Sequence, residues 1–290
     1  MLLTKFDPWK SHTVTYQFCT CPDKLTFNPY TGCDLKCLYC YASSYIPNFF
    51  KCRPKKNLVQ MLEQESRKLK GEIISISNSS DPYPPIEKEL GLTRKCLEIL
   101  LRQNCKIQII TKSNLVTRDI DVLKRTTSMV AISITTENDE ISKKLEPNAP
   151  LTSTRLKAIE TLTQKEIPVC VRIDPVIPFL NDNPSELIKS LASMGVKHIT
   201  SSTYKVKADN WRRFSTVFPE ISKRLASHYH ERGERVRGYR YLPREIRYSL
   251  MKRVKELTEQ NKMKFGTCRD GLSQLNSATC DGSWLLLEAS

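Results

Sequence analysis

The sequence has 290 residues, 39% of them hydrophobic, which is enough to bury a full core in one large α/β domain or two smaller ones. It contains no run of about 18 apolar residues, so it predicts no transmembrane helix. The opening residues MLLTKFDPWK lack the apolar stretch and small-residue cleavage site of a secretion signal, so we expect a cytoplasmic protein with no membrane contact. The net charge of +15 favours partners rich in phosphate.

Six short β-rich runs alternate with amphipathic stretches along the chain. The predicted strands are Leu25–Phe27, Ile73–Ser77, Lys106–Thr111, Met129–Ile134, Pro168–Ile173 and His198–Ser201. The predicted helices are Asn57–Leu69, Glu87–Arg102, Arg118–Lys124, Thr152–Gln164, Pro184–Met194, Trp211–His228 and Pro243–Gln260. Strands that alternate with helices over short loops are typical of a parallel sheet covered by helices.

The alternation predicts an α/β fold, namely a partial (β/α)6 TIM-type barrel with N- and C-terminal extensions. We expect an N-terminal extension with a cysteine pair over residues 1–24 and the barrel over residues 25–205. A basic helical region that ends in a cysteine-containing loop follows over residues 206–290. In parallel barrels the chemistry lies at the carboxyl ends of the strands, and these ends are rich in hydroxyl, amide and charged side chains here.

Eleven cysteines are too many for chance in a cytosolic protein, where disulfides are disfavoured, so they indicate metal or redox chemistry. Three of them, Cys33, Cys37 and Cys40, lie within the segment GCDLKCLYC after the first predicted strand. Structural zinc usually takes four ligands, and no histidine lies nearby in the sequence. Three thiolates can instead hold three corners of a [4Fe–4S] cluster and leave the fourth iron open. A zinc site or a plain electron-transfer cluster is the alternative.

The C-x-x-x-C-x-x-C spacing, with Tyr39 before the last cysteine, resembles the hallmark of the radical S-adenosylmethionine (SAM) superfamily. The resemblance implies that SAM binds the open iron through its amino and carboxylate groups. It implies further that one electron cleaves SAM to a 5′-deoxyadenosyl radical, which abstracts hydrogen from a substrate at the barrel mouth. A reductant such as ferredoxin or flavodoxin is implied as a partner.

The segments at 77–100, 109–123 and 174–178 resemble the spore photoproduct lyase-like branch, often called DNA repair photolyase-like proteins. This resemblance covers roughly residues 25–205. It implies that Ser80, Lys112 and Ser133 hold SAM, with Asn78 near the methionyl amine and Arg172 near the ribose or carboxylate. A structural ion pair with Asp174 is the alternative for Arg172.

One departure concerns the hydrogen donor. Spore photoproduct lyase carries a cysteine just before the first of these serines, where this sequence has Ser79. Serine is a poor hydrogen-atom donor, so we expect that the chain does not repair the spore thymine dimer itself. Tyr41 matches a tyrosine that assists in the lyase, which makes it a candidate catalytic residue, with simple packing beside the cluster as the alternative. Cys52 is a thiol that could replace the missing donor.

Four further cysteines lie near the two chain ends, Cys19 and Cys21 before the barrel and Cys268 and Cys280 in the terminal loop. They predict a second metal site that holds either an iron–sulfur cluster or zinc. The alternative is four unconnected thiols.

The region from Tyr204 to Lys264 holds 17 Lys and Arg against 7 Asp and Glu, a difference of +10. Within it Arg237, Arg240 and Arg244 alternate with tyrosines, a pattern that favours DNA or RNA binding. A solvated basic face is the alternative. Three functions follow for the chain. The first is a radical SAM enzyme that modifies or repairs a nucleic acid. The second is one that acts on a protein or metabolite. The third is an iron–sulfur or zinc nucleic-acid-binding protein without turnover.

Overall fold

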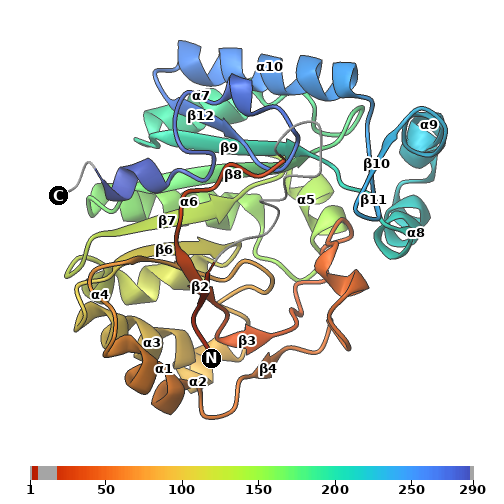
Figure 1. Ribbon diagram of the computed structural model, residues 1–290. Helices are drawn as coiled ribbons and strands as arrows, with labels where there is room; N and C mark the ends of the chain where they lie inside the picture. The colour runs from red at the N-terminus through yellow and green to blue at the C-terminus, as the bar shows by residue number, and fades with distance from the viewer. Residues whose placement is uncertain (1, 6–17, 288–290) are drawn as a thin grey trace.

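The computed structural model describes residues 2–5 and 18–287, whose strands form one curved sheet with helices on its outside (Figure 1). In spatial order the sheet comprises β1 (Thr4–Lys5), β2 (Leu25–Phe27), β5 (Ile73–Ile76), β6 (Lys106–Thr111), β7 (Ser128–Ser133), β8 (Val169–Val176), β9 (His198–Thr203) and β12 (Lys264–Thr267). All neighbouring strands are parallel except β1, which pairs with β2 in the antiparallel sense. The predicted partial α/β barrel is therefore confirmed, with an extra strand at each edge.

Ten α-helices are present in the described part of the chain. They are α1 (Leu58–Ser66), α2 (Glu87–Leu90), α3 (Leu92–Leu101), α4 (Ile120–Leu123), α5 (Asp139–Leu145), α6 (Thr152–Gln164), α7 (Ser185–Ser193), α8 (Ala208–Val217), α9 (Pro219–His230) and α10 (Arg244–Gln260). Short 3₁₀ helices are η1 (Ala42–Ser44), η2 (Asn114–Asp119), η3 (Ser273–Leu275) and η4 (Ser283–Leu286). Two small antiparallel sheets complete the secondary structure, namely β3 (Tyr30–Thr31) with β4 (Arg53–Pro54) and the hairpin of β10 (Glu234–Val236) with β11 (Tyr239–Tyr241). None of the described helices is long and apolar enough to cross a membrane.

Successive residues along a strand point to opposite faces of the sheet and therefore pack in two different layers. In β7, Val130 and Ile132 belong to the main core between the sheet and the helices. Met129 and Ala131 point the other way and pack against Leu285 and Leu286 of the C-terminal 3₁₀ helix η4. The end of the described chain therefore fills part of the barrel interior, while the carboxyl ends of the strands stay available for a site.

The predicted helices need two corrections, both caused by one residue that breaks the helix. The predicted helix Glu87–Arg102 is two helices, because Gly91 has a φ of +57°, a left-handed conformation that ends a helix. The predicted helix Trp211–His228 is also two, because the ring of Pro219 prevents Phe218 from continuing α8. Both breaks lie in outer helices, so they leave the sheet unchanged.

Sequence reasoning missed α5, the hairpin β10–β11 and β12. The helix α5 is capped by Asn138, whose side-chain oxygen accepts hydrogen bonds from the backbone N–H groups of Glu140 and Ile141 at 2.9 and 3.1 Å. β12 pairs with β9 from Lys264 to Thr267, so the C-terminal region contributes a strand to the barrel sheet. The division of the chain at residues 24 and 205 stays a prediction.

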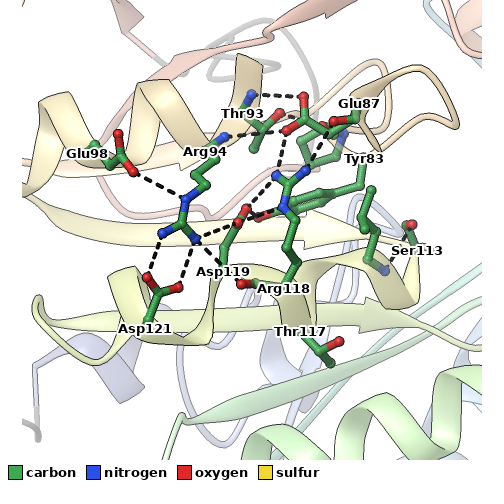
Figure 2. A network of polar contacts seen from close by, with 12 residues as sticks. Tyr83, Glu87, Thr93, Arg94, Glu98, Ser113, Thr117, Arg118, Asp119 and Asp121 are labelled. Carbon is green, nitrogen blue, oxygen red and sulfur yellow. Dashed lines mark hydrogen bonds and ion pairs between the residues drawn. The ribbon is translucent and has the colours of Figure 1, made fainter. Parts of the chain in front are cut away.

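A network of buried ion pairs fixes the loops that follow β5 and β6 (Figure 2). Arg118 contacts Glu87 at 2.7 Å and Asp119 at 2.8 Å, and both carboxylates are fully buried. The hydroxyl of Tyr83 donates to Asp119 at 3.0 Å, and that of Tyr30 donates to Glu87 at 2.5 Å. The network ties the loop after β5 to the loop after β6, and these two loops form part of the mouth of the barrel.

Candidate functional site

A cavity of about 590 Å³ lies at the carboxyl ends of the strands. It brings together residues from the cysteine loop, from the ends of β5 to β9 and from both chain ends. The predicted site residues that line it are Cys33, Cys37, Tyr39, Cys40, Tyr41, Asn78, Ser80, Lys112, Ser133 and Arg172, with Cys21 and Cys268 of the terminal cysteines. Segments more than 200 residues apart in sequence therefore meet at one cavity.

The cysteine loop runs from β3 to η1 and is pinned by backbone contacts. Gly32 has a φ of +78°, and a side chain there would place its Cβ only 2.5 Å from the carbonyl oxygen of Phe49. The N–H of Cys33 donates to that same oxygen at 2.7 Å, and the N–H of Leu38 donates to Leu145 at 2.8 Å. These contacts hold the loop against the strand ends, which places all three thiols at the cavity.

The three thiols lie in an apolar cluster with Leu35 and Phe49. Burial raises the pKa of Cys37 to about 12, although Lys112 opposes the shift, and it raises the pKa of Cys33 well above its ordinary range. Among the described residues, this apolar group of side chains includes no fourth cysteine and no histidine. A [4Fe–4S] cluster bound here would therefore displace the protons of the three thiols. One of its four irons would have no protein thiolate as a ligand.

Behind the cysteines lies a buried polar group that sequence reasoning missed. The hydroxyl of Tyr39 donates to Glu146, and Arg155 forms an ion pair with the other oxygen of that carboxylate at 2.5 Å. The ammonium group of Lys112 lies 5.5 Å from the centre of the Tyr39 ring. Burial would raise the pKa of Glu146, but Arg155 and Lys112 outweigh it and hold the pKa below its ordinary value. Glu146 therefore carries a charge that balances two cations.

Asp81 joins the two loops that carry Ser80 and Lys112. Its carboxylate accepts the hydroxyl of Thr111 at 2.7 Å and the backbone N–H of Lys112 at 2.8 Å. The hydroxyl of Ser80 donates to the carbonyl of Tyr30 at 2.8 Å. Sequence reasoning did not select Asp81, although an aspartate directly after the serines of SNSSDP is a residue type that often orders a loop through its own backbone.

The other predicted contacts lie on neighbouring strands. The amide of Asn78 donates to the hydroxyl of Thr26 at 2.5 Å. The backbone carbonyl of Ser133 accepts a guanidinium N–H of Arg155 at 2.8 Å. Arg172 forms an ion pair with Asp174 at 2.7 Å, which was the alternative to a SAM contact. Because Arg172 also lines the cavity, the ion pair and a ligand contact are compatible.

Tyr41 lies at the cavity wall beside residues of the C-terminal region. Its ring meets that of Tyr239 edge to face, with the ring centres 5.5 Å apart. Arg269 donates to its hydroxyl at 2.9 Å and also lies over its ring. Ser79 lines the cavity as well, whereas Cys52 does not, which argues against Cys52 as the replacement hydrogen donor.

The terminal cysteines and the basic residues differ in their relation to the cavity. Cys19, Cys21 and Cys280 form a buried cluster of their own, and Cys268 lies at the end of β12. Arg237, Arg240 and Arg244 do not line the cavity. Arg237 and Arg244 are exposed, and Arg240 is half-buried and donates to the carbonyl of His230 at 3.2 Å.

Residues 27–200 match the Radical SAM superfamily. An uncharacterized protein of Methanocaldococcus jannaschii is 34% identical over 172 residues, a match that covers 55% of this chain and 62% of that protein. A protein of Pseudomonas phage M6, called a radical SAM Nalpha-GlyT isomerase, is 27% identical over 179 residues, 59% of this chain and 37% of its own. The chain thus spans less than two thirds of the length of these two relatives.

Among solved structures, spore photoproduct lyase with bound AdoMet and dinucleoside spore photoproduct aligns with a TM-score of 0.62. The alignment covers 86% of this chain and 76% of the lyase at 16% identity, so it shows a shared fold. The cofactors are a [4Fe–4S] cluster and SAM, and the site fits both. The three thiols meet in an apolar pocket, and polar side chains from neighbouring strands face the same cavity. This chain therefore belongs to the radical SAM superfamily of enzymes.

Proposed function

We propose that this enzyme removes a hydrogen atom from a nucleic acid held at the mouth of the barrel. When bound, the cluster and SAM supply the one-electron chemistry for that step, and the protein positions the substrate and excludes competing reactions. A cytoplasmic location and a reductant such as ferredoxin or flavodoxin complete the proposal. The free thiols are typical of a reducing compartment.

The wall of the cavity formed by Tyr41, Tyr239 and Arg269 carries the proposal. The guanidinium carbon of Arg269 lies 5.0 Å from the centre of the Tyr41 ring and 5.4 Å from that of Tyr239. The ammonium group of Lys207 lies 4.4 Å from the centre of the Tyr239 ring. Aromatic rings stack on bases and cations attract phosphates, so this wall suits a nucleotide better than an apolar metabolite.

Two further observations add support. The lyase that shares the fold is solved with a dinucleoside photoproduct, although its low identity to this chain limits the comparison to the fold. The basic region from Tyr204 to Lys264 carries the hairpin β10–β11, which supplies Tyr239 to the cavity wall. A long polyanion that enters the cavity would therefore meet cations beyond it as well as within it.

Lys112 is expected to hold the SAM carboxylate. Burial would lower the pKa of its ammonium group, but Cys37 and Glu146 outweigh burial and raise the pKa, so the group is charged. Replacement of Lys112 by methionine should weaken SAM binding about 10–100-fold, the cost of one hydrogen bond to a charged group. Equilibrium dialysis with labelled SAM on the iron-loaded protein measures it. Iron content should stay unchanged, and unaltered SAM affinity would show that Lys112 has no such contact.

Binding to oligonucleotides tests the substrate class. Fluorescence anisotropy at several salt concentrations should show that affinity for single-stranded DNA or RNA falls steeply with salt. The variant R237Q/R240Q/R244Q should have a shallower slope, by about 0.7 per phosphate contact that is lost. The matched variant K88Q/K157Q/K165Q removes three exposed lysines, one in α2, one in α6 and one directly after α6, and should keep the original slope.

Measurement of turnover distinguishes a substrate from a molecule that only binds. An oligonucleotide that is a substrate should increase the formation of 5′-deoxyadenosine, and a deuterated oligonucleotide should transfer deuterium to it. If peptides or small metabolites increase 5′-deoxyadenosine formation and none of the DNA or RNA oligonucleotides does, the nucleic-acid proposal is contradicted. The superfamily assignment would stay intact.

A further inference from the structure

Four cysteines from the two ends of the described chain meet beside the cavity. The sulfurs of Cys21 and Cys280 lie 3.5 Å apart, although these residues are 259 positions apart in sequence. Cys19 packs with these two cysteines, and all three are buried in one cluster. Cys268 comes directly after β12 and lines the same cavity as Cys21. The four cysteines, which lie near opposite ends of the sequence, are thus neighbours in the fold.

The backbone around these cysteines is held tightly. A side chain at Gly266 in β12 would place its Cβ 2.6 Å from the Cα of Cys280, so only glycine permits this close approach. The hydroxyl of Thr200 donates to the carbonyl of Cys280 at 3.0 Å, and the N–H of Cys268 donates to Ser201 at 2.8 Å. Both C-terminal cysteines are therefore anchored to β9 or β12.

Two cations, Lys24 and Arg172, lie beside the group of thiols. Lys24 forms a buried ion pair with Asp281, the residue next to Cys280, and donates to Gln108 at 3.0 Å. The guanidinium of Arg172 interacts electrostatically with Cys268. Because four thiolates around a divalent ion carry a net charge of about −2, nearby cations of this kind stabilise such a site.

We propose that Cys19, Cys21, Cys268 and Cys280 bind a single zinc ion in tetrahedral geometry. With zinc–sulfur bonds of about 2.3 Å, the sulfurs of such a site lie about 3.8 Å apart, close to the separation of Cys21 and Cys280. An iron–sulfur cube would spread its thiolates over separate corners and hold them farther apart. Binding replaces four S–H bonds by four S–Zn bonds and releases four protons, with no change in oxidation state.

The thiols must turn toward a common centre to bind the ion. Among residues 2–5 and 18–287, no three His, Cys, Asp or Glu side chains are placed so that they could hold a metal ion without moving. Zinc at this place would join the segment before β2 to the loop after β12. It would also close the wall of the cavity on which Cys21 and Cys268 lie.

Metal content of the full-length protein tests the site. After anaerobic purification with zinc and iron present, elemental analysis should give about one zinc and about four irons per chain. Cys280→Ser and Cys268→Ser should each lower zinc to below about 0.1 per chain and keep the iron. Cys37→Ser should show the reverse, and Cys105→Ser, which removes a buried thiol outside both groups, should keep both metals. Cobalt in place of zinc should give the absorption bands of a tetrahedral thiolate site.

Three results would overturn the proposal. About eight irons and no zinc would mean that the four thiols hold a second cluster. A Cys21–Cys280 disulfide without metal would mean a covalent link instead. Zinc that survives Cys268→Ser and Cys280→Ser would place the ion elsewhere. If Cys280→Ser does not fold, the half-buried Cys268 still supplies the decisive variant, because its replacement opens no core cavity.

Discussion

Replacement of Cys37 by serine should abolish iron loading and SAM cleavage. Cys37 is buried among Leu35 and Phe49, so no other thiol or water can take its place at the cluster without a rearrangement of the loop. Loss of a partner that only orients a ligand costs about 10–100-fold in metal affinity, so loss of the ligand itself should cost more. Iron and acid-labile sulfide per chain, together with 5′-deoxyadenosine formation, measure the result.

The control for this experiment is Cys96→Ser. Cys96 is fully buried in α3, so its replacement introduces a hydroxyl into a core without touching the cavity. The Cys96 variant should keep its iron and its activity even if its stability falls. A Cys37 variant with about four irons and normal SAM cleavage would contradict the assignment of the cluster ligands.

The central strands β5 to β8 were predictable because each carries a short apolar run, which is typical of a parallel sheet buried on both faces. β12 was not predictable, because KFGT has only one large apolar residue and becomes a strand through its pairing with β9. The hairpin β10–β11 is rich in arginine, and its tyrosines face inward, where Tyr241 is fully buried and Tyr239 lines the cavity.

Some residues of the site could also be predicted from the sequence, and others could not. Residues that directly follow a strand, such as Ser80 and Lys112, could be placed at the cavity because all strand ends meet there. Glu146 and Arg155 could not, since they lie in or beside outer helices, and Glu146 contacts Tyr39 across 107 residues of sequence while Arg155 contacts Glu146. A buried arginine and glutamate in an otherwise amphipathic helical region look like surface residues until the fold is known.

Arg155 and Glu146 make the strongest stability prediction. Both side chains are 0% exposed, and Arg155 also donates to the carbonyl of Ser133 at 2.8 Å. Replacement of Arg155 by methionine should lower the free energy of unfolding by about 3–5 kcal/mol, because it leaves Glu146 buried without its main cation. Chemical denaturation of the cluster-free protein measures this effect without interference from metal loading.

The matched control is the exposed pair of Arg102 and Glu63, whose charged atoms are 3.4 Å apart. Arg102→Met should cost less than about 1 kcal/mol, as is usual for surface ion pairs. The double variant R155M/E146Q should recover part of the lost stability, because it removes the unpaired charge together with the cation. An Arg155 variant as stable as the Arg102 variant would show that the buried pair adds little.

The pH dependence of the unfolding free energy tests whether Arg155 and Glu146 interact through their charges. In the wild type the pKa of Glu146 is lower in the folded than in the unfolded state, because Arg155 and Lys112 outweigh its burial. Its stabilising contribution is therefore complete above the unfolded pKa of about 4.3 and is lost as the pH falls through the folded pKa. In Arg155→Met the folded pKa rises, so the variant loses less stability in acid. The difference in unfolding free energy between the two proteins should narrow below about pH 4, and a constant difference would mean that Arg155 acts through packing rather than charge.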